Sequence, residues 1–131
     1  MLRPAVPADL TALLAIRDAA GPDALSDPAL VTEDRLIAAD AVTACDEAGR
    51  VVGFAATGGA AVHLLVDSGA RGTGVGRELL AAACAAVKQA GHATATLTLA
   101  PGSTAEHHYR AAGWRRTGQT RAGGMVLKKP L

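Results

Sequence analysis

The sequence predicts a mixed α/β or α+β fold with a central sheet and helices, arranged in three layers. Three observations lead to this prediction: β-type segments recur along the whole chain, two strand-helix-strand passages come late, and a glycine-rich loop separates a strand from the longest helix. The 131 residues suit one domain spanning 1–131, since single cores usually form at about this length. Half of the residues are apolar but only three are aromatic, so we expect a core of Leu and Val.

Alternating and helical patterns of apolar residues place the individual elements. The expected strands cover residues 2–5, 41–45, 51–57, 62–66, 94–99 and 125–128. Four helices are expected. The first runs from after residues 7–9 to before Gly21, the second from 32 to 39, the third from 74 to before Gly91, and the fourth from 103 to 112. Residues 21–28 are rich in Gly, Pro and Asp and predict a mobile loop. Ser103 and Glu106 have the spacing of a capping box, which predicts the last helix start.

Several classes of function are disfavoured by composition. No stretch reaches the ~18 apolar residues of a membrane span, and the N-terminus lacks a secretory signal, so we expect a cytoplasmic protein without a membrane partner. Cys45 and Cys84 are expected to be buried free thiols. The four histidines do not join them at a spacing typical of zinc sites, so no metal is expected.

Charge is distributed unevenly along the chain, although the net charge is only +1. Residues 1–50 hold nine acids and four bases, whereas residues 51–131 hold three acids and nine bases. The second part should therefore attract a polyanionic ligand, unless the imbalance is ordinary variation of surface charge. Nucleic acid is a weak candidate for that ligand because the basic tail, residues 115–129, carries almost no aromatic stacking surface.

The glycine-rich loop is the most informative motif. Gly72, Gly74 and Gly76 lie between a predicted strand and a helix N-terminus, where backbone N–H groups lack partners and favour a phosphate. The dinucleotide fingerprint is excluded because it requires glycine where Arg77 stands. The nucleotide-hydrolysing P-loop is excluded because its Gly-Lys-Ser or Gly-Lys-Thr ending is missing. A tight turn without any ligand is the remaining alternative.

At this point the sequence resembles the GNAT (GCN5-related N-acetyltransferase) family. That family's acetyl-CoA loop has Arg or Gln, two residues, then Gly-x-Gly or Gly-x-Ala, which the segment Arg71-Gly72-Thr73-Gly74-Val75-Gly76 matches. Leu64-Leu65-Val66-Asp67 is similar to the strand before the loop, and His108-Tyr109-Arg110-Ala111-Ala112-Gly113-Trp114 is similar to the later Phe-Tyr-x-x-x-Gly-Phe segment. The start, Arg3-Pro4-Ala5, is also typical, so the resemblance covers nearly the whole chain.

The resemblance implies a mostly antiparallel central sheet with helices on both faces and acetyl-CoA as co-substrate. The cofactor's pantetheine arm would pair with the backbone of Leu64, Leu65 and Val66. Its pyrophosphate would lie on the loop and helix start, formed by Arg71, Gly72, Thr73, Gly74, Val75, Gly76 and Arg77. Gly102 stands where the family often has asparagine, and the hydroxyl of Ser103 is the expected substitute. The resemblance is also compatible with a homodimer.

The implied activity is direct transfer of an acetyl group to a primary amine of a small molecule or peptide. The family likeness assigns the general acid to Tyr109 and the oxyanion donor to the backbone N–H of Leu65. His63 is the candidate base, because histidine titrates near neutral pH, with water or a structural role for His63 as alternatives. The acidic N-terminal part predicts a cationic acceptor. A non-catalytic acyl-CoA sensor or partner-binding module is the alternative function.

Overall fold

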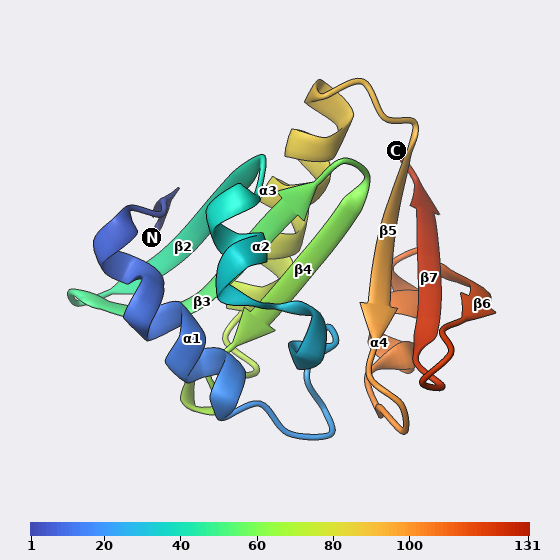
Figure 1. The fold of residues 1–131 in the computed structure, drawn as a ribbon, viewed down its shortest axis with the longest axis horizontal. Helices are drawn as coiled ribbons and strands as arrows, with labels where there is room; N and C mark the ends of the chain where they lie inside the picture. The colour runs from blue at the N-terminus through green and yellow to red at the C-terminus, as the bar shows by residue number, and fades with distance from the viewer.

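The computed structural model describes residues 1–131, whose seven strands form one mixed sheet (Figure 1). The strands are β1 (Leu2–Pro4), β2 (Ala41–Glu47), β3 (Arg50–Gly58), β4 (Ala61–Val66), β5 (Thr94–Leu99), β6 (Arg115–Gln119) and β7 (Met125–Pro130). Their order across the sheet is β1-β2-β3-β4-β5-β7-β6. All neighbours are antiparallel except β4 and β5, which are parallel. The predicted mixed, mostly antiparallel fold is confirmed.

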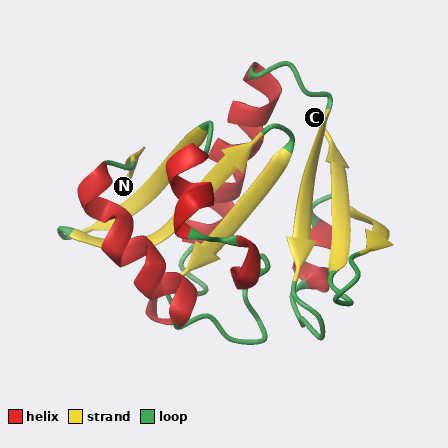
Figure 2. Ribbon diagram, in the orientation of Figure 1, coloured by secondary structure: helices red, strands yellow, loops and turns green.

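Helices cover both faces of the sheet (Figure 2). They are α1 (Leu10–Asp18), α2 (Glu33–Ala38), α3 (Val75–Gln89) and α4 (Glu106–Ala111), with short 3₁₀ turns at Pro7–Asp9, Pro28–Leu30 and Ser68–Ala70. In Figure 1, α1 and α2 lie in front of the sheet and α3 and α4 lie behind it. No helix is long and apolar enough to cross a membrane.

Each face of the sheet has its own apolar core. The larger cluster joins α3 and α4 to the sheet and includes Leu79, Leu97, Tyr109 and Trp114. The rings of Tyr109 and Trp114 meet edge to face, with centroids 5.7 Å apart. The smaller cluster joins α1 and α2 to the other face through residues such as Leu13. The sheet is therefore packed against helices through a separate apolar core on each face.

The parallel strands β4 and β5 pair only through the first two residues of β4, which lie beside the middle of β5. Ala61 and Val62 pair with Thr96 and Leu97, and no further pairs follow. Beyond them the two strands diverge toward their C-terminal ends, as Figure 1 shows. The divergence leaves the outer backbone groups of β4 without a neighbouring strand, which in a sheet makes them available to another partner.

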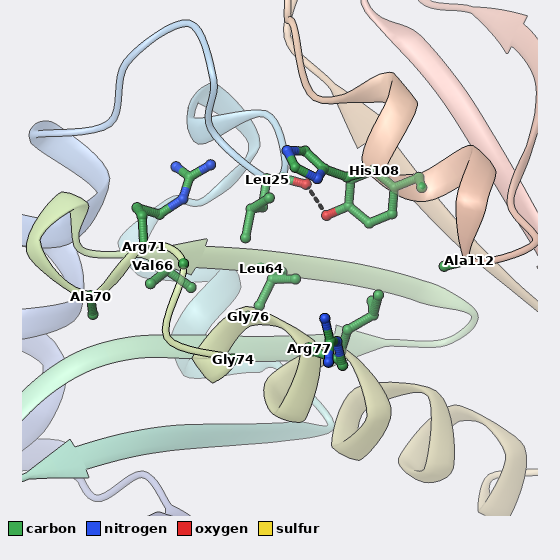
Figure 3. Close-up of a pocket in the computed structure, with 13 residues that line it drawn as sticks. Leu25, Leu64, Val66, Ala70, Arg71, Gly74, Gly76, Arg77, His108 and Ala112 are labelled. Atoms are coloured by element: carbon green, nitrogen blue, oxygen red, sulfur yellow. Dashed lines mark hydrogen bonds between the residues drawn. The ribbon is translucent and has the colours of Figure 1, made fainter.

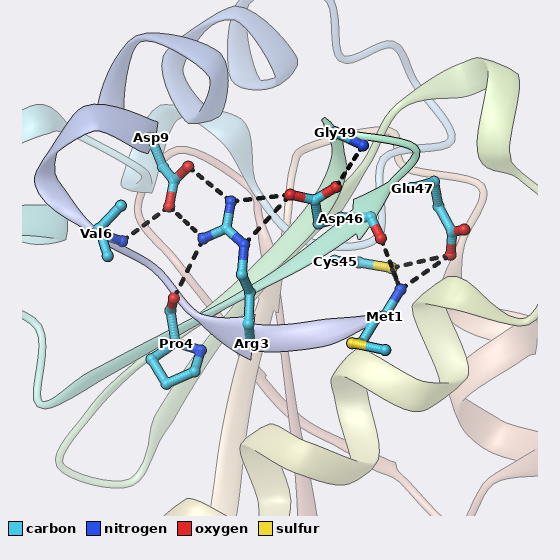
Figure 4. Close-up of polar contacts among 9 residues, drawn as sticks. All are labelled: Met1, Arg3, Pro4, Val6, Asp9, Cys45, Asp46, Glu47 and Gly49. Atoms are coloured by element: carbon cyan, nitrogen blue, oxygen red, sulfur yellow. Dashed lines mark hydrogen bonds and ion pairs between the residues drawn. The ribbon is translucent and has the colours of Figure 1, made fainter.

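The N-terminal strand is fixed by a network of charged groups (Figure 4). The guanidinium of Arg3 donates to both oxygens of Asp9, at 2.7 and 2.9 Å, and to Asp46 at 3.2 Å. The Arg3 hydrogen bonds, together with one from the N–H of Val6, lower the pKa of Asp9 to about 2. One guanidinium of the N-terminal half therefore binds two carboxylates at the β1 edge of the sheet.

Local differences from the sequence predictions have simple physical causes. The β2–β3 hairpin turns at two residues, Ala48 and Gly49, both with positive φ, so its strands are longer than predicted. Helix α4 begins at Glu106, three residues later than predicted, because Ser103 accepts from the N–H of Ala105 instead of forming a capping box.

Two further predictions need correction. Strand β6 was missed because all five of its residues are exposed and show no apolar alternation. Cys45 is fully buried as expected, but Cys84 is only partly buried.

The predicted N-cap at Thr32 is confirmed, since its hydroxyl accepts from the N–H of Arg35 at 3.1 Å.

Candidate active site

The glycine-rich loop forms the N-terminus of α3, the longest helix. Gly72 and Gly74 have φ of +78° and +89°, a region that side chains with a Cβ rarely adopt, and Gly74 is the N-cap. The first helical hydrogen bond runs from the N–H of Glu78 to the carbonyl of Gly74. None of the six N–H groups from Gly72 to Arg77 donates to another protein atom. The loop therefore presents a row of free donors at the positive end of a helix dipole.

These donors border a cavity of about 330 Å³ (Figure 3). It lies between the start of α3, the end of β4 and helix α4. Its lining includes Leu64, Val66, Arg71, Gly72, Gly74, Gly76, Arg77, Leu80, His108 and Tyr109. Most of these residues were expected from the sequence. Leu25, Ala70 and Leu80, which also line the cavity, belong to none of the motifs, and Ala112 lies in the His108–Trp114 motif without a role assigned to it.

Two arginines give the cavity its positive charge. Arg77 lines it and forms no ion pair. Arg71 also lines it, but its guanidinium donates to the carbonyl of Asp23 at 3.0 Å and lies 3.5 Å from the carboxylate of the same residue. Arg77 is therefore the freer of the two for an anionic ligand.

Residues 21–27, which we call the strap, contribute Leu25 to the lining of this cavity. They were expected to be a mobile loop, but hydrogen bonds anchor them at several points. Besides Arg71, the N–H of Thr104 donates to the carbonyl of Pro22, and the N–H of Asp27 donates to the carbonyl of Thr98 at 2.8 Å. The strap thus fills the space between the diverging strands.

Ser26 anchors the strap to β4, and its side chain is completely buried there. Its hydroxyl donates to the carbonyl of Leu64 at 3.1 Å and accepts from the N–H of Leu64 at 2.9 Å. One hydroxyl thus satisfies both the N–H and the C=O of Leu64, one of the three residues expected to pair with pantetheine. In this structure Leu64 cannot pair with a second partner unless Ser26 moves.

Alternation along β4 decides which of its backbone groups face the cavity. Leu64 faces Ser26, and the N–H of Asp67 donates to Val52 of β3. In an antiparallel pair, successive residues point their N–H and C=O groups to opposite sides. The N–H of Leu65 therefore faces β3, while the N–H groups of Leu64 and Val66 face the diverging side. This geometry does not support Leu65 as an oxyanion donor and favours Leu64.

Tyr109 reaches the cavity from α4. Its side chain is almost entirely buried, and its hydroxyl donates to the carbonyl of Leu25 in the strap (Figure 3). Burial raises the pKa of the phenol, so the group keeps its proton at neutral pH. Tyr109 can therefore donate a proton but is poorly suited to accept one.

The remaining residues near the site differ in position. Of the neighbouring histidines His107 and His108, only His108 lines the cavity. Ser103 does not line it, because its hydroxyl accepts from Ala105 in the turn before α4. Thr73 and Val75 can contribute only backbone N–H groups, since the Thr73 hydroxyl donates to Ala70 and the Val75 side chain is buried.

A second cavity, of about 490 Å³, lies on the opposite face of the sheet beside α2. His63 alternates with Leu64 along β4 and lines this second cavity, together with Arg35 and Thr98. Burial is the main cause that lowers the pKa of His63, and the positive charge of Arg35 adds to it, so the imidazole is neutral at pH 7. The strap lies between the cavities, with Leu25 lining the first and Asp27 bonded to Thr98 in the second.

Comparison with known proteins identifies the fold and the family. Residues 26–127 match the model of the acetyltransferase (GNAT) domain. No curated protein sequence matches significantly. Among solved structures, the ribosomal-protein-alanine N-acetyltransferase of Brucella melitensis is 26% identical with a TM-score of 0.77, and the match covers 100% of this chain and 99% of that one.

Two more distant structures share the fold. A GCN5-related N-acetyltransferase from Rhodopseudomonas palustris is 20% identical, with a TM-score of 0.81 and coverage of 100% and 95%. An N-acetyltransferase from Thermoplasma acidophilum in complex with coenzyme A is 12% identical, with a TM-score of 0.73 and coverage of 100% and 98%. With the domain model matching most of its length, the chain belongs to the GNAT family of acetyl-CoA-dependent N-acetyltransferases.

Proposed function

We propose that residues 1–131 act as one domain that transfers the acetyl group of acetyl-CoA directly to a primary amine. The observation that carries this proposal is the row of six free N–H groups, Gly72 to Arg77, beside a cavity that also contains Tyr109. Free donors at a helix N-terminus suit a pyrophosphate, and a buried phenol suits protonation of a leaving thiolate. A ligand-free turn would not need both features in one cavity.

The cofactor contacts follow from the free groups around the first cavity. The N–H groups of the loop, including those of Thr73 and Val75, would bind the pyrophosphate, and Arg77 would add a charge-assisted contact. Arg71 would join it by exchanging Asp23 for phosphate. The outward backbone groups of Leu64 and Val66 would pair with the amides of pantetheine. Ser103 is left out of this set.

Pairing at Leu64 requires Ser26 to leave β4, and this can be tested with Ser26→Ala. The variant leaves two buried backbone groups of Leu64 without partners, which typically costs about 1–3 kcal/mol of folding free energy. Acetyl-CoA would satisfy those groups, so we expect a lower Tm without cofactor and a larger cofactor-induced rise in Tm than in the wild type. Thermal denaturation with and without acetyl-CoA measures both. An equal rise in the two proteins would contradict displacement of Ser26.

The chemistry divides among three groups of this chain. The amine nitrogen forms a bond to the acetyl carbon, and the bond from that carbon to sulfur breaks. The N–H of Leu64, freed from Ser26, would stabilise the negative charge that develops on the acetyl oxygen. Tyr109 would release its bond to Leu25 and give its proton to the departing sulfur. The amine loses a proton to His63 or to water.

His63 lines the second cavity, on the face from which an amine could approach the strand junction. Its pKa is lowered, mainly by burial, so the neutral, basic form already prevails at a lower pH than for an ordinary histidine. We expect kcat/KM to rise with pH through this lowered pKa and to level off, and His63→Gln to remove this rise and lower the plateau about 10- to 100-fold. Measurement from pH 5 to 8 checks this. If the rise persists in the variant, water is the base.

The overall proposal is tested by incubating the chain with acetyl-CoA and a panel of amines, with mass spectrometry of the products. Acetylated amine and free coenzyme A should appear in equal amounts. Tyr109 is hydrogen-bonded to Leu25 and Leu64 to Ser26, so neither group is free for catalysis in this structure. This favours one alternative function, a protein that binds acyl-CoA without transferring the acyl group. Cofactor binding without any acetylated product across the panel would support that sensor function.

A further inference from the structure

The side chains that line the second cavity indicate which class of amine accepts the acetyl group. This inference rests on the proposed function. Most of its lining is apolar, including Leu30, Val31, Leu36 and Ala56. The polar groups are the side chains of Arg35, His63, Thr57 and Thr98. A volume of about 490 Å³ is sufficient for a small ligand with a short aliphatic chain.

Arg35 is the single formally charged residue of this lining. One guanidinium N–H donates to the carbonyl of Leu30 at 3.1 Å, which anchors the side chain. No carboxylate lies within ion-pair distance, so the remaining N–H groups are available to a ligand. A guanidinium held by one contact and open at its other edge is suited to bind a carboxylate.

No acid of the N-terminal half lines this cavity, although Glu33 and Asp34 precede Arg35 on α2 and Asp40, which accepts from the N–H of Gly59, follows Ala39 of the lining. Asp9 and Asp46 bind Arg3, Asp18 binds Arg17, Asp23 lies beside Arg71, and Glu47 binds the N-terminal amine. The negative charge of Asp27 opposes the lowering of the His63 pKa by burial and by Arg35, but the Asp27 carboxylate accepts from the N–H of Ala29 and does not line the cavity. The expectation of a cationic acceptor rested on those acids, whereas the charged side chain that lines this cavity is that of Arg35.

We propose that the acceptor is a small amine that also carries a carboxylate, which Arg35 binds while the amine lies toward His63 and the β4–β5 junction. Both side chains line the same cavity, so one short molecule can reach both. A second ammonium group in place of the carboxylate would face Arg35 and be repelled. Arg35 would thereby select among amines of equal length.

Three amines of similar length test this inference: γ-aminobutyrate, butylamine and putrescine, which end in a carboxylate, a methyl group and an ammonium group. Binding to the protein saturated with coenzyme A is followed by NMR titration, and turnover with acetyl-CoA is measured separately. The wild type should bind γ-aminobutyrate about tenfold more tightly than putrescine, and kcat/KM should follow the same order. Arg35→Gln should reduce the difference to about twofold. Arg116→Gln, on the exposed strand β6, should preserve it.

The two readouts separate this inference from the proposed function. Selective, Arg35-dependent binding without acetylated product would support the carboxylate site and contradict catalysis. Equal binding of the three amines, a preference for putrescine, or selectivity that survives in Arg35→Gln would overturn the inference, even if acetyl transfer occurs.

Discussion

Tyr109→Phe should lower kcat about 100- to 10,000-fold while leaving the affinity for acetyl-CoA within a few-fold of the wild type. This range is typical for removal of a general acid. The substitution keeps the ring that packs against Trp114 and removes only the hydroxyl, which donates to Leu25. The lost hydrogen bond should cost about 1 kcal/mol of stability, too little to unfold a typical domain. Steady-state kinetics and calorimetric titration with acetyl-CoA measure the two effects.

A control must separate proton donation from anchoring of the strap. Ser26→Ala also removes an anchor of the strap but keeps the phenol. Its kcat should stay within about tenfold of the wild type, because stability and cofactor affinity are the properties it changes. If Tyr109→Phe and Ser26→Ala lower kcat equally, or if Tyr109→Phe is fully active, Tyr109 is not the acid.

Gly76→Asp should abolish useful cofactor binding without harming the fold. Gly76 is the second residue of α3, and its φ is not in the left-handed region. A Cβ there would meet the end of the flexible Leu25 side chain at 3.0 Å, a contact that a small shift relieves. A carboxylate in the first turn of a helix is stabilising by about 0.3–1 kcal/mol. The same carboxylate would stand where the pyrophosphate is proposed to bind.

The repulsion between this carboxylate and a phosphate can be estimated. Two charges 4 Å apart near a protein surface interact by about 4 kcal/mol, so affinity should fall at least about 100-fold. Gly76→Asn has nearly the same size without the charge and should lose only about threefold to tenfold. Calorimetric titration with acetyl-CoA and thermal denaturation of both variants check these values. Equal losses in the two variants would show that bulk, rather than an anion site, determines the effect.

Sequence reasoning succeeded where local chemistry determines structure. The loop from Arg71 to Gly76 could be placed between strand and helix because positive φ and free helix N–H groups leave a glycine pattern in the sequence. The apolar period of α3 and the Thr32 cap are local in the same sense. The family resemblance added the mostly antiparallel order of the strands, which composition alone does not determine.

It failed where contacts join residues distant in the sequence. Ser26 and Leu64 are 38 residues apart, and Tyr109 and Leu25 are 84 apart. Nothing in the composition of the strap predicts either bond, so a segment rich in turn residues was expected to be mobile. Arg35 was overlooked because charge was counted by sequence position, whereas several acids of the N-terminal half form ion pairs with other arginines away from this cavity.

The most direct test follows the backbone N–H groups at the start of α3 during a titration with coenzyme A, by two-dimensional NMR of uniformly ¹⁵N-labelled protein. Resonances of Gly72 to Arg77 should show the largest shifts and saturate together, with the proton signals moving downfield as each N–H donates to phosphate. Saturation of binding with these resonances unmoved, and shifts confined to another surface, would contradict the assignment of this loop as the phosphate site.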